Sequence, residues 1–581
     1  MASRTRGLTY FRVILLLSVA VAIGATAMNV ANGSAMPQQE GAAESSNEQE
    51  PAAQPAVPAE ADGDDTIGLD QQIDEAFAPV ADWWEGFILT AVPVAPGQSV
   101  PLVVLLLVVG ATFFTVYFGF INVRLFPFAI NVVSGKYDDV EKEGAEEIKG
   151  VEVAEVDGDL VDTIRDEAEH GEVSHFQALA TAVSGTVGLG NIAGVAVAIA
   201  TGGPGATFWM IVCGILGMST KFVECTLGVR YRDIDENGVV HGGPMYYLSK
   251  GLTNLGLAPL GVFLGGLFAV LCIGASLGGG NAFQANQATQ QIMTLFNIDQ
   301  NGAGGTIIGI VLAILVGIVI IGGIKRIASI TEKIVPLMAI IYVAAALLIL
   351  ILNASAVPTA ISEIISGAFT PAAGFGGLLG VLIVGFQRAA FSNEAGAGSA
   401  AIAHSAVKTR YPASEGIVAL LEPFIDTVVI CTMTALVIVI YNTNNIFPYG
   451  DVESSAVLID GARVGGVDLT SRAFDYALPN FSYVLTIAII LFAFSTMISW
   501  SYYGLQSWKY LFGRSKASDL SFKILFCVFI VIGAAASLNS VIKFSDAMIL
   551  ALVFPNMIGL LLLFPKVRAE LKRYIAATKG K

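Results

Sequence analysis

The sequence carries little charge for its length. Only 13% of its 581 residues are Asp, Glu, Lys or Arg, whereas an ordinary soluble domain carries about 25%. Apolar residues make up 55% of the chain, and the mean hydropathy is +0.70. Glycine is frequent, with 62 residues, as it is in membrane helices, where it lets backbones approach closely. This composition excludes a soluble enzyme and predicts an all-α, polytopic membrane protein.

Cysteine is scarce, and no catalytic or nucleotide motif stands in a suitable context. The five cysteines are odd in number, widely spaced and embedded in apolar runs, so they predict small buried side chains rather than disulfides or a metal site. Residues 274–278 match G-x-S-x-G, but they lie within a predicted spanning helix, where a nucleophile elbow cannot form. The chain has no Walker loop. We therefore expect no enzyme, no cofactor, no transition metal and no nucleic-acid partner.

The net charge of −16 comes from two segments. Residues 37–85 hold 13 acidic and no basic side chains, and residues 138–172 hold 15 acidic and 3 basic ones, so together they carry −25. The rest of the chain is therefore positive, at +9. Its loops can carry the Lys/Arg signal that orients membrane helices.

The first 35 residues have the pattern of a secretory signal peptide. Arg4, Arg6 and Arg12 precede an apolar run, and small residues follow it at 25–27. The segment 36–85, rich in Ala, Pro, Glu and Gln, predicts an acidic, disordered extracytoplasmic tail.

Eleven apolar segments long enough to span a membrane follow. Their flanking Lys and Arg residues gather on one side if the N-terminus is outside and the C-terminus is cytoplasmic, as expected for a protein of the cell (inner) membrane. We expect a leading helix with a cytoplasmic amphipathic segment at 86–137, an acidic cytoplasmic insert at 138–172, and a cytoplasmic tail at 571–581. The spans are expected at 100–120, 176–200, 206–228, 259–295, 305–323, 334–353, 373–406, 416–441, 481–511, 521–541 and 546–565.

Two of these spans contain residues that interrupt a helix. Residues 184–191 place three glycines within six positions, near the middle of the second span, and residues 391–399 interrupt the seventh. Unwound backbone at membrane depth costs several kcal/mol per unsatisfied group unless protein, water or a ligand bonds it. A half-helix N-terminus favours a carboxylate, and exposed carbonyls favour Na⁺. Both interruptions therefore predict a binding site.

The positions of the interruptions predict an inverted repeat. Without the leading helix, they fall in the first and sixth of ten spans, which are matching positions of two five-helix halves. An odd number of spans gives the two halves opposite topology. We predict a 5+5 core with two broken helices, built from repeats at 173–353 and 354–570.

Several motifs resemble the alanine/glycine:cation symporter family from about residue 85 to 570. That resemblance implies a leucine-transporter-type fold with one extra leading helix, and sodium-coupled uptake of small neutral amino acids. Many members have Thr where this chain has Leu189, so substrate preference is expected to differ. The matching segments are residues 174–179, 188–196, 202–206, 242–247, 391–396 and 500–504.

The resemblance also implies roles for individual residues. The amides of Gly188, Leu189 and Gly190 would receive the substrate carboxylate. Carbonyls and hydroxyls between the first and eighth core helices would hold sodium, and Asn191 and Asn393 are candidates for a second ion or for the substrate. The other implied substrate residues are Asn281, Gln284, Phe391 and Trp500, and the other implied ion residues are Ser184, Val187, Ser495 and Thr496.

Charged residues inside the spans are functional candidates because burying them is costly. Glu422 and Asp426 are four residues apart, on one helix face, and we assign Asp426 an ion or gating role. Arg388 and Glu394 flank the second interruption, and we expect Arg388 to pair with Glu394 or with Asp426. Three residues apart, Lys221 and Glu224 are expected to form an internal pair.

The sequence thus predicts a secondary active symporter of alanine or glycine in the lipid bilayer, with Na⁺ as the coupling ion and alternating access to the site. A proton-coupled transporter of another small zwitterion and a passive channel are the alternatives. Oligomeric state has no signal in the sequence.

Overall fold

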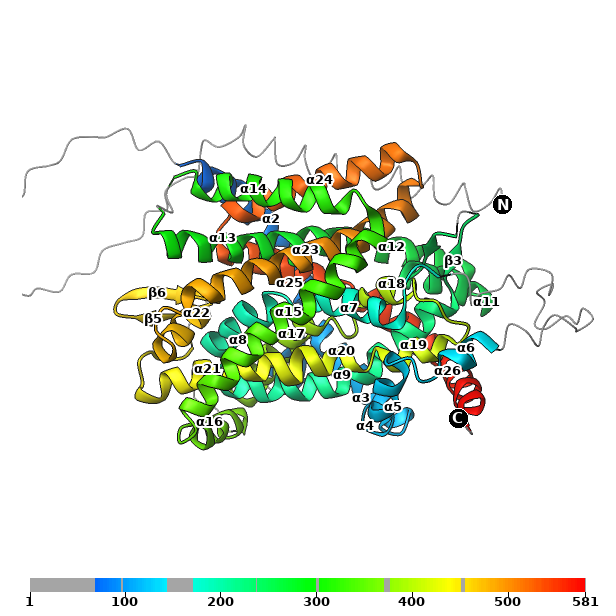
Figure 1. Ribbon diagram of the computed structural model, residues 1–581, viewed down its shortest axis with the longest axis horizontal. Coiled ribbons are helices and arrows are strands. Elements are labelled where there is room, and N and C mark those ends of the chain that lie inside the picture. Colours follow the sequence, from blue (N-terminus) through cyan, green and yellow to red (C-terminus); the bar gives the residue numbers. More distant parts are fainter. Residues whose placement is uncertain are drawn as a thin grey trace, which may run out of the picture. The chain divides into compact units, whose positions relative to one another are not determined.

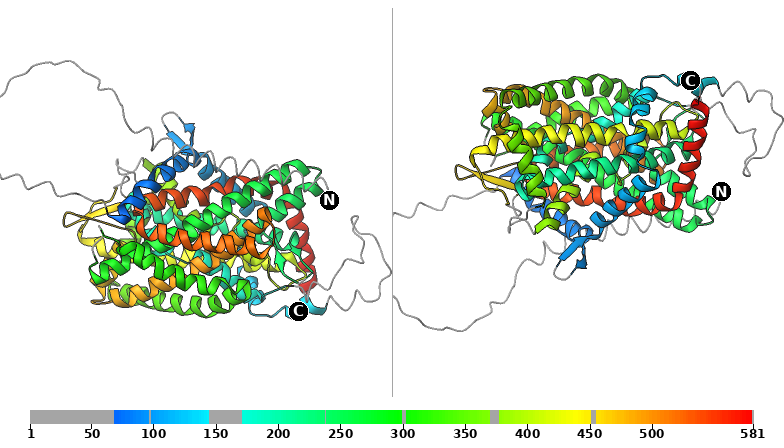
Figure 2. Two further views of the ribbon diagram at one scale, coloured as in Figure 1. Left: turned by 90° about the horizontal axis from the view of Figure 1, so that it is seen from above. Right: turned by 90° about the horizontal axis from the view of Figure 1, so that it is seen from below.

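The computed structural model describes residues 68–95, 98–143, 171–236, 238–298, 302–369, 377–450 and 455–579. The expected signal peptide, the tail up to residue 67 and residues 144–170 of the acidic insert lie outside the described residues. Within residues 68–579 the long helices run alongside one another, and the end of α26 (Val553–Thr578) crosses at one end of them (Figures 1 and 2).

The described part begins with a helix, α2 (Leu69–Ile88), where the sequence predicts disorder. Ala81 and Ile88 are buried, and Phe77 contacts Phe544 edge to face, with ring centroids 5.1 Å apart. Asp70 accepts hydrogen bonds from the backbone N–H groups of Gly305 and Thr306, at the start of another helix, where a carboxylate is favourable. The prediction of disorder is therefore wrong for residues 69–85.

The first predicted interruption is present in the second apolar segment. Helix α7 (His175–Thr186) begins with a capping box, in which Ser174 and Gln177 bond each other's backbone N–H groups. The chain then leaves the helix and re-enters it as η3 (Gly190–Gly194) and α8 (Val195–Gly202). The two parts meet at a bend of 50°.

The second predicted interruption is also present. Helix α17 (Gly377–Asn393) ends in a turn, and α18 (Ala400–His404) follows. Glu394, Gly396 and Gly398 have positive φ angles of 56°, 97° and 84°. Such angles come easily only to glycine, so the glycines in this segment permit the turn.

Seven single helical spans in the described residues are long and apolar enough to cross a membrane, or eight when the bent α7–α8 pair is included. Three expected spans fall short by length: α3 (Leu102–Tyr117) and α14 (Gly304–Ile320) have 16 and 17 residues, and α17 has 17. The count of eleven and the 5+5 layout therefore remain predictions. The seven comprise α9 (Gly205–Arg230), α12–η5–α13 (Ala258–Leu277, Gly278–Ala282, Phe283–Phe296), α15 (Gly323–Leu352), α19–α20–η7–α21 with η8 (Pro412–Val418, Leu421–Pro423, Phe424–Cys431, Thr432–Tyr441, Asn442–Asn444), α23 (Ser482–Phe512), α24 (Lys516–Ala535), and α25 (Leu538–Ala551) with α26.

Short elements fill the connections, including two in segments where the sequence predicts only loops. Helix α16 (Val357–Phe369) lies within the segment 354–372, and α22 (Gly466–Ala477) lies within 442–480. The other short elements are the antiparallel hairpins β1–β2 (Ala91–Ala95, Gln98–Pro101), β3–β4 (Asp233–Ile234, Val240–His241) and β5–β6 (Ala456–Ile459, Ala462–Gly465), and the helices α4 (Ile121–Arg124), α5 (Phe126–Val133), α6 (Asp138–Glu143), α10 (Pro244–Tyr246), η4 (Tyr247–Gly251) and α11 (Leu252–Asn254).

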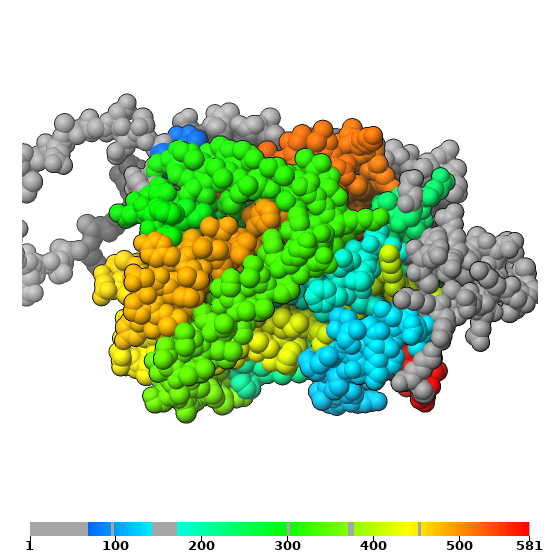
Figure 3. All heavy atoms as spheres, in the orientation of Figure 1, coloured from blue at the N-terminus to red at the C-terminus, as the bar shows by residue number. Residues whose placement is uncertain are grey.

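The apolar surface of the helices faces outward as well as inward. Helix α15 crosses obliquely over the face shown in Figure 3, with Leu337, Ile340 and Ile351 exposed and Met338 and Tyr342 buried. A helix that is apolar on all sides is buried in protein or in lipid. These exposed side chains fit the acyl chains of a bilayer.

Candidate functional site

The two interruptions lie against each other in the core. A Cβ atom added to Gly190 would lie 3.4 Å from the Phe391 ring and 3.5 Å from the backbone of Ser392. Gly190 belongs to the first interruption, and Phe391 and Ser392 to the end of α17, so residues about 200 positions apart meet at one place. A Cβ atom at position 190 would therefore be in ordinary van der Waals contact with the end of α17.

Side-chain amide oxygens cap the free N–H groups of the first interruption. The Gly188 N–H donates to Asn191 Oδ1 over 2.9 Å, and the Leu189 N–H donates to Gln284 Oε1 over 3.0 Å. These are two of the amides that the family resemblance assigns to the substrate carboxylate. Two neutral oxygen acceptors thus occupy the positions that the two oxygens of a carboxylate would take.

The predicted sodium residues between α7 and α23 are also in contact. The Thr496 hydroxyl donates to the Ser184 carbonyl over 2.9 Å, and the Ser184 hydroxyl donates to the Ser495 carbonyl over 2.8 Å. The Ser495 hydroxyl donates to Phe492 O. Val187 is buried where α7 ends, and its N–H donates to Val183 O. These oxygens are hard ligands suited to an alkali cation, and here they bond one another.

Asp426 joins the two interruptions. It is fully buried on η7 and accepts hydrogen bonds from Asn191 of the first interruption and from Ser392 of α17. Thr427 also donates to it, over 2.8 Å. Among the described residues no Lys, Arg or His lies within salt-bridge distance of Asp426. A buried carboxylate with hydroxyl and amide neighbours but no cationic partner is a candidate cation ligand.

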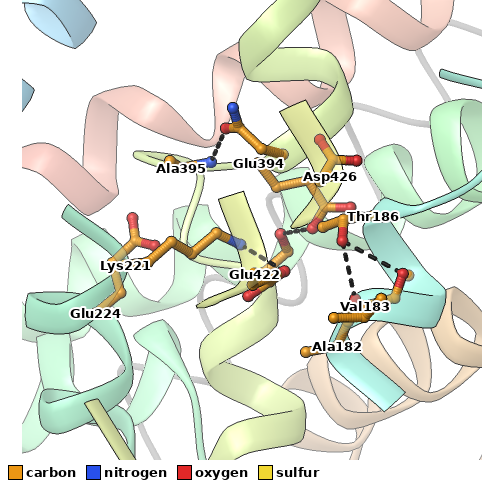
Figure 4. Close-up of polar contacts among 12 residues, drawn as sticks. Ala182, Val183, Thr186, Lys221, Glu224, Glu394, Ala395, Glu422 and Asp426 are labelled. Carbon is orange, nitrogen blue, oxygen red and sulfur yellow. Dashed lines mark hydrogen bonds and ion pairs between the residues drawn. The ribbon is translucent and has the colours of Figure 1, made fainter. Parts of the chain in front are cut away.

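Asn393 stabilises the second interruption. Its Nδ2 donates to Thr427 Oγ1 over 2.8 Å, and its Oδ1 accepts from the Ala395 N–H over 2.9 Å. It thereby ties the turn to η7, one residue from Asp426. Figure 4 shows Glu394, Asp426 and the Lys221–Glu422 pair in one view of this region.

Two aromatic side chains, Phe391 and Trp500, lie beside the interruptions. Phe391 contacts Phe283 edge to face, with ring centroids 5.0 Å apart. Trp500 is buried, and its indole N–H lies 3.2 Å from Gly185 O and 3.1 Å from Glu394 Oε1. A Cβ atom added to Gly280 would lie 2.1 Å from Trp500, so the indole packs directly on the η5 backbone.

The side-chain hydrogen bond of Asn281, a predicted substrate residue, points away from the interruptions. Its Nδ2 donates to the Phe526 carbonyl on α24 over 2.7 Å. Gln284, one helical turn further along, does reach the interruption. The side-chain contact of Asn281 thus joins η5 to α24.

Two predicted charge pairings are wrong because the partners come from distant segments. Arg388 pairs with Asp546 on α25 rather than with Glu394 or Asp426. Lys221 Nζ lies 3.1 Å from Glu422 Oε1, whereas Glu224 accepts from the Gly396 N–H and from Asn556. The sequence places these charges inside the spans, but only the helix packing determines which of them meet.

Helix α22, absent from the sequence prediction, covers the first interruption on one side. The Thr470 hydroxyl donates to Ile192 O over 3.0 Å, and the Val467 N–H donates to Gln287 Oε1 over 2.8 Å. Asp468 accepts from Gln290. Burial raises the pKa of Asp468, although this hydrogen bond opposes the shift.

These features define a class: a multi-pass membrane protein in which two broken helices meet and leave backbone and carboxylate groups in the core, as in secondary carriers. The sequence model of the sodium:alanine symporter family matches residues 90–581. The chain belongs to this family, and this membership indicates a carrier. Helix α2 precedes the matched residues.

Two relatives in sequence agree with this assignment. The chain is 39% identical over 475 residues to the sodium/alanine symporter AgcS of Methanococcus maripaludis, covering 82% of this chain and 94% of that one. It is 34% identical over 458 residues to the amino-acid carrier protein AlsT of Bacillus subtilis, covering 78% and 84%. The crystal structure of MhsT in complex with L-phenylalanine aligns with a TM-score of 0.45 and 15% identity, covering 69% of this chain and 100% of that one.

Proposed function

We propose that the protein is a secondary active symporter that couples sodium influx to uptake of alanine or glycine, with a leucine-transporter-type fold in the cell membrane. The observation that carries this proposal is the pair of capped amides, Gly188 and Leu189. Their acceptors, Asn191 and Gln284, are neutral side chains that a carboxylate can replace, because charge-assisted hydrogen bonds are about twice as strong as neutral ones.

The cation binds where buried oxygens gather. Sodium takes carbonyl and hydroxyl oxygens at Ser184, Val187, Ser495 and Thr496, and a second cation site includes Asn191 and Asp426. Sodium at either place changes the hydrogen bonds that Ser184 and Asn191 make, and Asn191 also caps the Gly188 amide. Ion and substrate affinity are then coupled, and the coupling is reciprocal.

The walls of the site select for size. Phe391 and Trp500 pack against the glycines of η5, where a Cβ atom on Gly279 would lie 3.2 Å from Phe391. The site therefore accepts a methyl side chain or hydrogen and excludes larger ones. A Trp500→Ala variant widens the site and extends uptake to larger neutral amino acids.

The test is uptake of labelled alanine and glycine into proteoliposomes, with and without an inward sodium gradient. Concentrative uptake that requires the gradient is the expected result. Accumulation driven equally by an inward proton gradient in the absence of sodium would favour proton coupling instead. Equilibration without accumulation under any gradient would indicate a channel.

A further inference from the structure

A cavity with an excess of basic side chains lies where the ends of three helices meet, whereas the predicted binding residues lie at the interruptions. The end of α23, the loop after it and the beginnings of α15 and α24 border a volume of about 540 Å³. We refer to it as the basic cavity. Its five cationic and two anionic lining side chains are Lys325, Lys509, Arg514, Lys516, Lys523, Glu172 and Asp519.

The carboxylates at this end of the helices neutralise only part of the basic charge. Asp519 pairs with both Lys509 and Lys523, over 2.9 and 2.6 Å. Arg514 pairs with Asp233, a residue beyond the cavity lining, over 2.9 Å. One carboxylate of the cavity thus serves two lysines, which leaves positive charge in excess.

Two further lysines of the basic cavity have no ion-pair partner. Lys325 near the start of α15 and Lys516 at the start of α24 are exposed, and neither lies within salt-bridge distance of a carboxylate in the parts of the chain that the structure describes. Glu172 interacts electrostatically with Lys325 and Lys509, but one negative charge cannot balance both. Positive charges gathered in this way favour a bound anion.

Uncharged groups of the cavity also favour an anion. Ser515 caps α24 by accepting from the Ser518 N–H, so the N-terminus of this 20-residue helix lies at the cavity, where the helix dipole favours negative charge. Tyr502 on α23 lines the cavity and is buried, and its hydroxyl makes no hydrogen bond to any described residue. Buried polar atoms nearly always have a partner, and a ligand with acceptor oxygens would supply one.

Apolar side chains adjoin the basic cavity on the outside of the molecule. Ile321, directly after α14, lines the cavity and is 70% exposed. Leu520 and Ile524, one turn apart on α24 and next to the lining residues Asp519 and Lys523, are 57% exposed. Helices α14 and α24 pack side by side at the edge of the molecule (Figures 1 and 3). An exposed apolar surface below a charged cavity matches the two parts of a phospholipid.

We propose that the basic cavity binds the headgroup of an anionic phospholipid, with the acyl chains along the outer faces of α14 and α24. A phosphate diester without a balancing cation, as in phosphatidylglycerol, brings negative charge to Lys325 and Lys516 and acceptor oxygens to Tyr502. A zwitterionic headgroup brings the same phosphate but adds a cation, which the lysines repel. The Lys/Arg pattern predicts that this end of the helices is cytoplasmic, the side on which basic pockets between helices bind anionic headgroups.

The bound lipid would hold the ends of α15, α23 and α24 together, whatever the protein transports. The test therefore measures lipid binding rather than uptake. It uses the full-length chain, delipidated in an uncharged detergent and titrated while native mass spectrometry counts the bound lipid. The probes are dioleoyl phosphatidylglycerol, dioleoyl phosphatidylcholine, and glycerol 3-phosphate, which carries the headgroup charge without acyl chains.

Phosphatidylglycerol should bind saturably and about tenfold or more tightly than either other probe, because it alone combines a net negative charge with acyl chains. Its affinity should fall as salt is added, since exposed charges are screened. A melting curve of the protein with and without each probe gives a second readout, in which phosphatidylglycerol should raise the melting temperature the most.

The informative variant is Lys325→Gln with Lys516→Gln, which removes the two lysines that have no ion-pair partner. Its affinity for phosphatidylglycerol should fall by about 20-fold to 30-fold, because each lysine contributes about fivefold. The matched control, Lys566→Gln with Lys572→Gln, removes the same charge from α26, outside the cavity lining, and should stay within about twofold of the wild type. Tyr502→Phe should weaken binding by about threefold.

Three outcomes would overturn the proposal. Equal binding of phosphatidylcholine and phosphatidylglycerol would remove the role of the basic charge. Glycerol 3-phosphate binding as tightly as the lipid would make the cavity a site for a soluble phosphate. Equal losses in the double variant and its control would show attraction by overall charge alone. If the lipid-free double variant does not melt cooperatively, Lys516→Gln decides, since this exposed side chain alone should account for about fivefold.

Discussion

The two interrupted helices meet in the core but present opposite chemistry. The first, between α7 and η3, offers backbone N–H groups that neutral amide oxygens cap. The second, between α17 and α18, carries a carboxylate, Glu394, and lies beside two more, Asp426 and Glu224. One interruption therefore suits an anionic group and the other a cationic one. A zwitterion with a companion cation needs both.

The largest expected effect tests the close packing of the first interruption. In Gly188→Ala, the new Cβ atom would lie 2.3 Å from Thr496 Oγ1, so the backbone or α23 must shift. Overpacking of this kind costs about 1–3 kcal/mol. Alanine uptake should fall by about 100-fold, because the clash joins Gly188 of the predicted substrate site to Thr496 of the predicted sodium site. Gly194→Ala is the control, since nothing lies within 4 Å of its added Cβ. Equal loss in both variants would show that helix flexibility, not packing, matters here.

The next effect separates ion binding from substrate binding. Asp426→Asn keeps the shape of the side chain. It removes the negative charge to which Asn191 and Ser392 donate hydrogen bonds. The sodium concentration that gives half-maximal alanine binding should rise by about 30-fold, because hydrogen bonds and ion contacts to a charged group are worth about 1.5–3 kcal/mol. Binding assays at graded sodium concentrations measure the shift. An unchanged sodium dependence would remove Asp426 from the ion site.

Replacing Gln284 by glutamate, which has nearly the same shape but a negative charge, tests whether the first interruption binds the substrate carboxylate. Gln284→Glu places a carboxylate oxygen next to the Leu189 N–H, where the amide oxygen lies at 3.0 Å. The N–H stays satisfied, but the fixed charge repels a substrate carboxylate. Affinity for alanine should therefore fall about tenfold. The melting temperature should fall as well, because the hydrogen bond from Gln284 Nε2 to the Gly279 carbonyl, 2.9 Å long and buried, is lost. Isothermal titration and a melting curve check the two parts. Wild-type affinity would mean that the substrate carboxylate binds elsewhere.

The positions of both interruptions could be predicted from sequence, because a cluster of glycine, serine and asparagine in an apolar segment lowers the local preference for a helix. Contacts within one predicted site could also be anticipated, as with Ser184 and Thr496. The partners of Arg388 and Lys221 could not, since they lie 158 and 201 positions away, on helices whose packing no local pattern encodes.

Helix α2 could not be predicted from the sequence for a different reason. Its acidic residues indicate disorder when they are counted as solvated charge. In the structure, Asp70 caps α14 and Asp82 pairs with Lys543. An acidic composition is therefore compatible with a folded helix when the carboxylates have hydrogen-bond or ion-pair partners in the rest of the structure.

A smaller effect concerns the contact between the two interruptions. The Trp500 indole N–H lies within hydrogen-bond distance of Gly185 O in the first interruption and of Glu394 in the second. Trp500→Phe keeps an aromatic wall and removes this donor, which is worth about 0.5–1.5 kcal/mol. Alanine uptake should fall about threefold to fivefold, and size selection should be retained. Uptake of alanine, serine and leucine measured side by side checks this, and a broadened range would mean that the hydrogen bond, not the ring, sets the size.

The smallest expected effect lies at Leu189, whose own N–H is one of the two capped amides and donates to Gln284. Leu189 is fully buried. Leu189→Thr loses apolar contact, which costs about 1 kcal/mol, but it adds a hydroxyl beside the predicted carboxylate site. If the first interruption is the anionic end, the added donor should offset most of this loss, leaving alanine affinity within about twofold and shifting the glycine-to-alanine preference. Competition binding with both amino acids measures the ratio. A loss as large as that of Gln284→Glu would mean that Leu189 acts by packing alone and that the hydroxyl finds no carboxylate there.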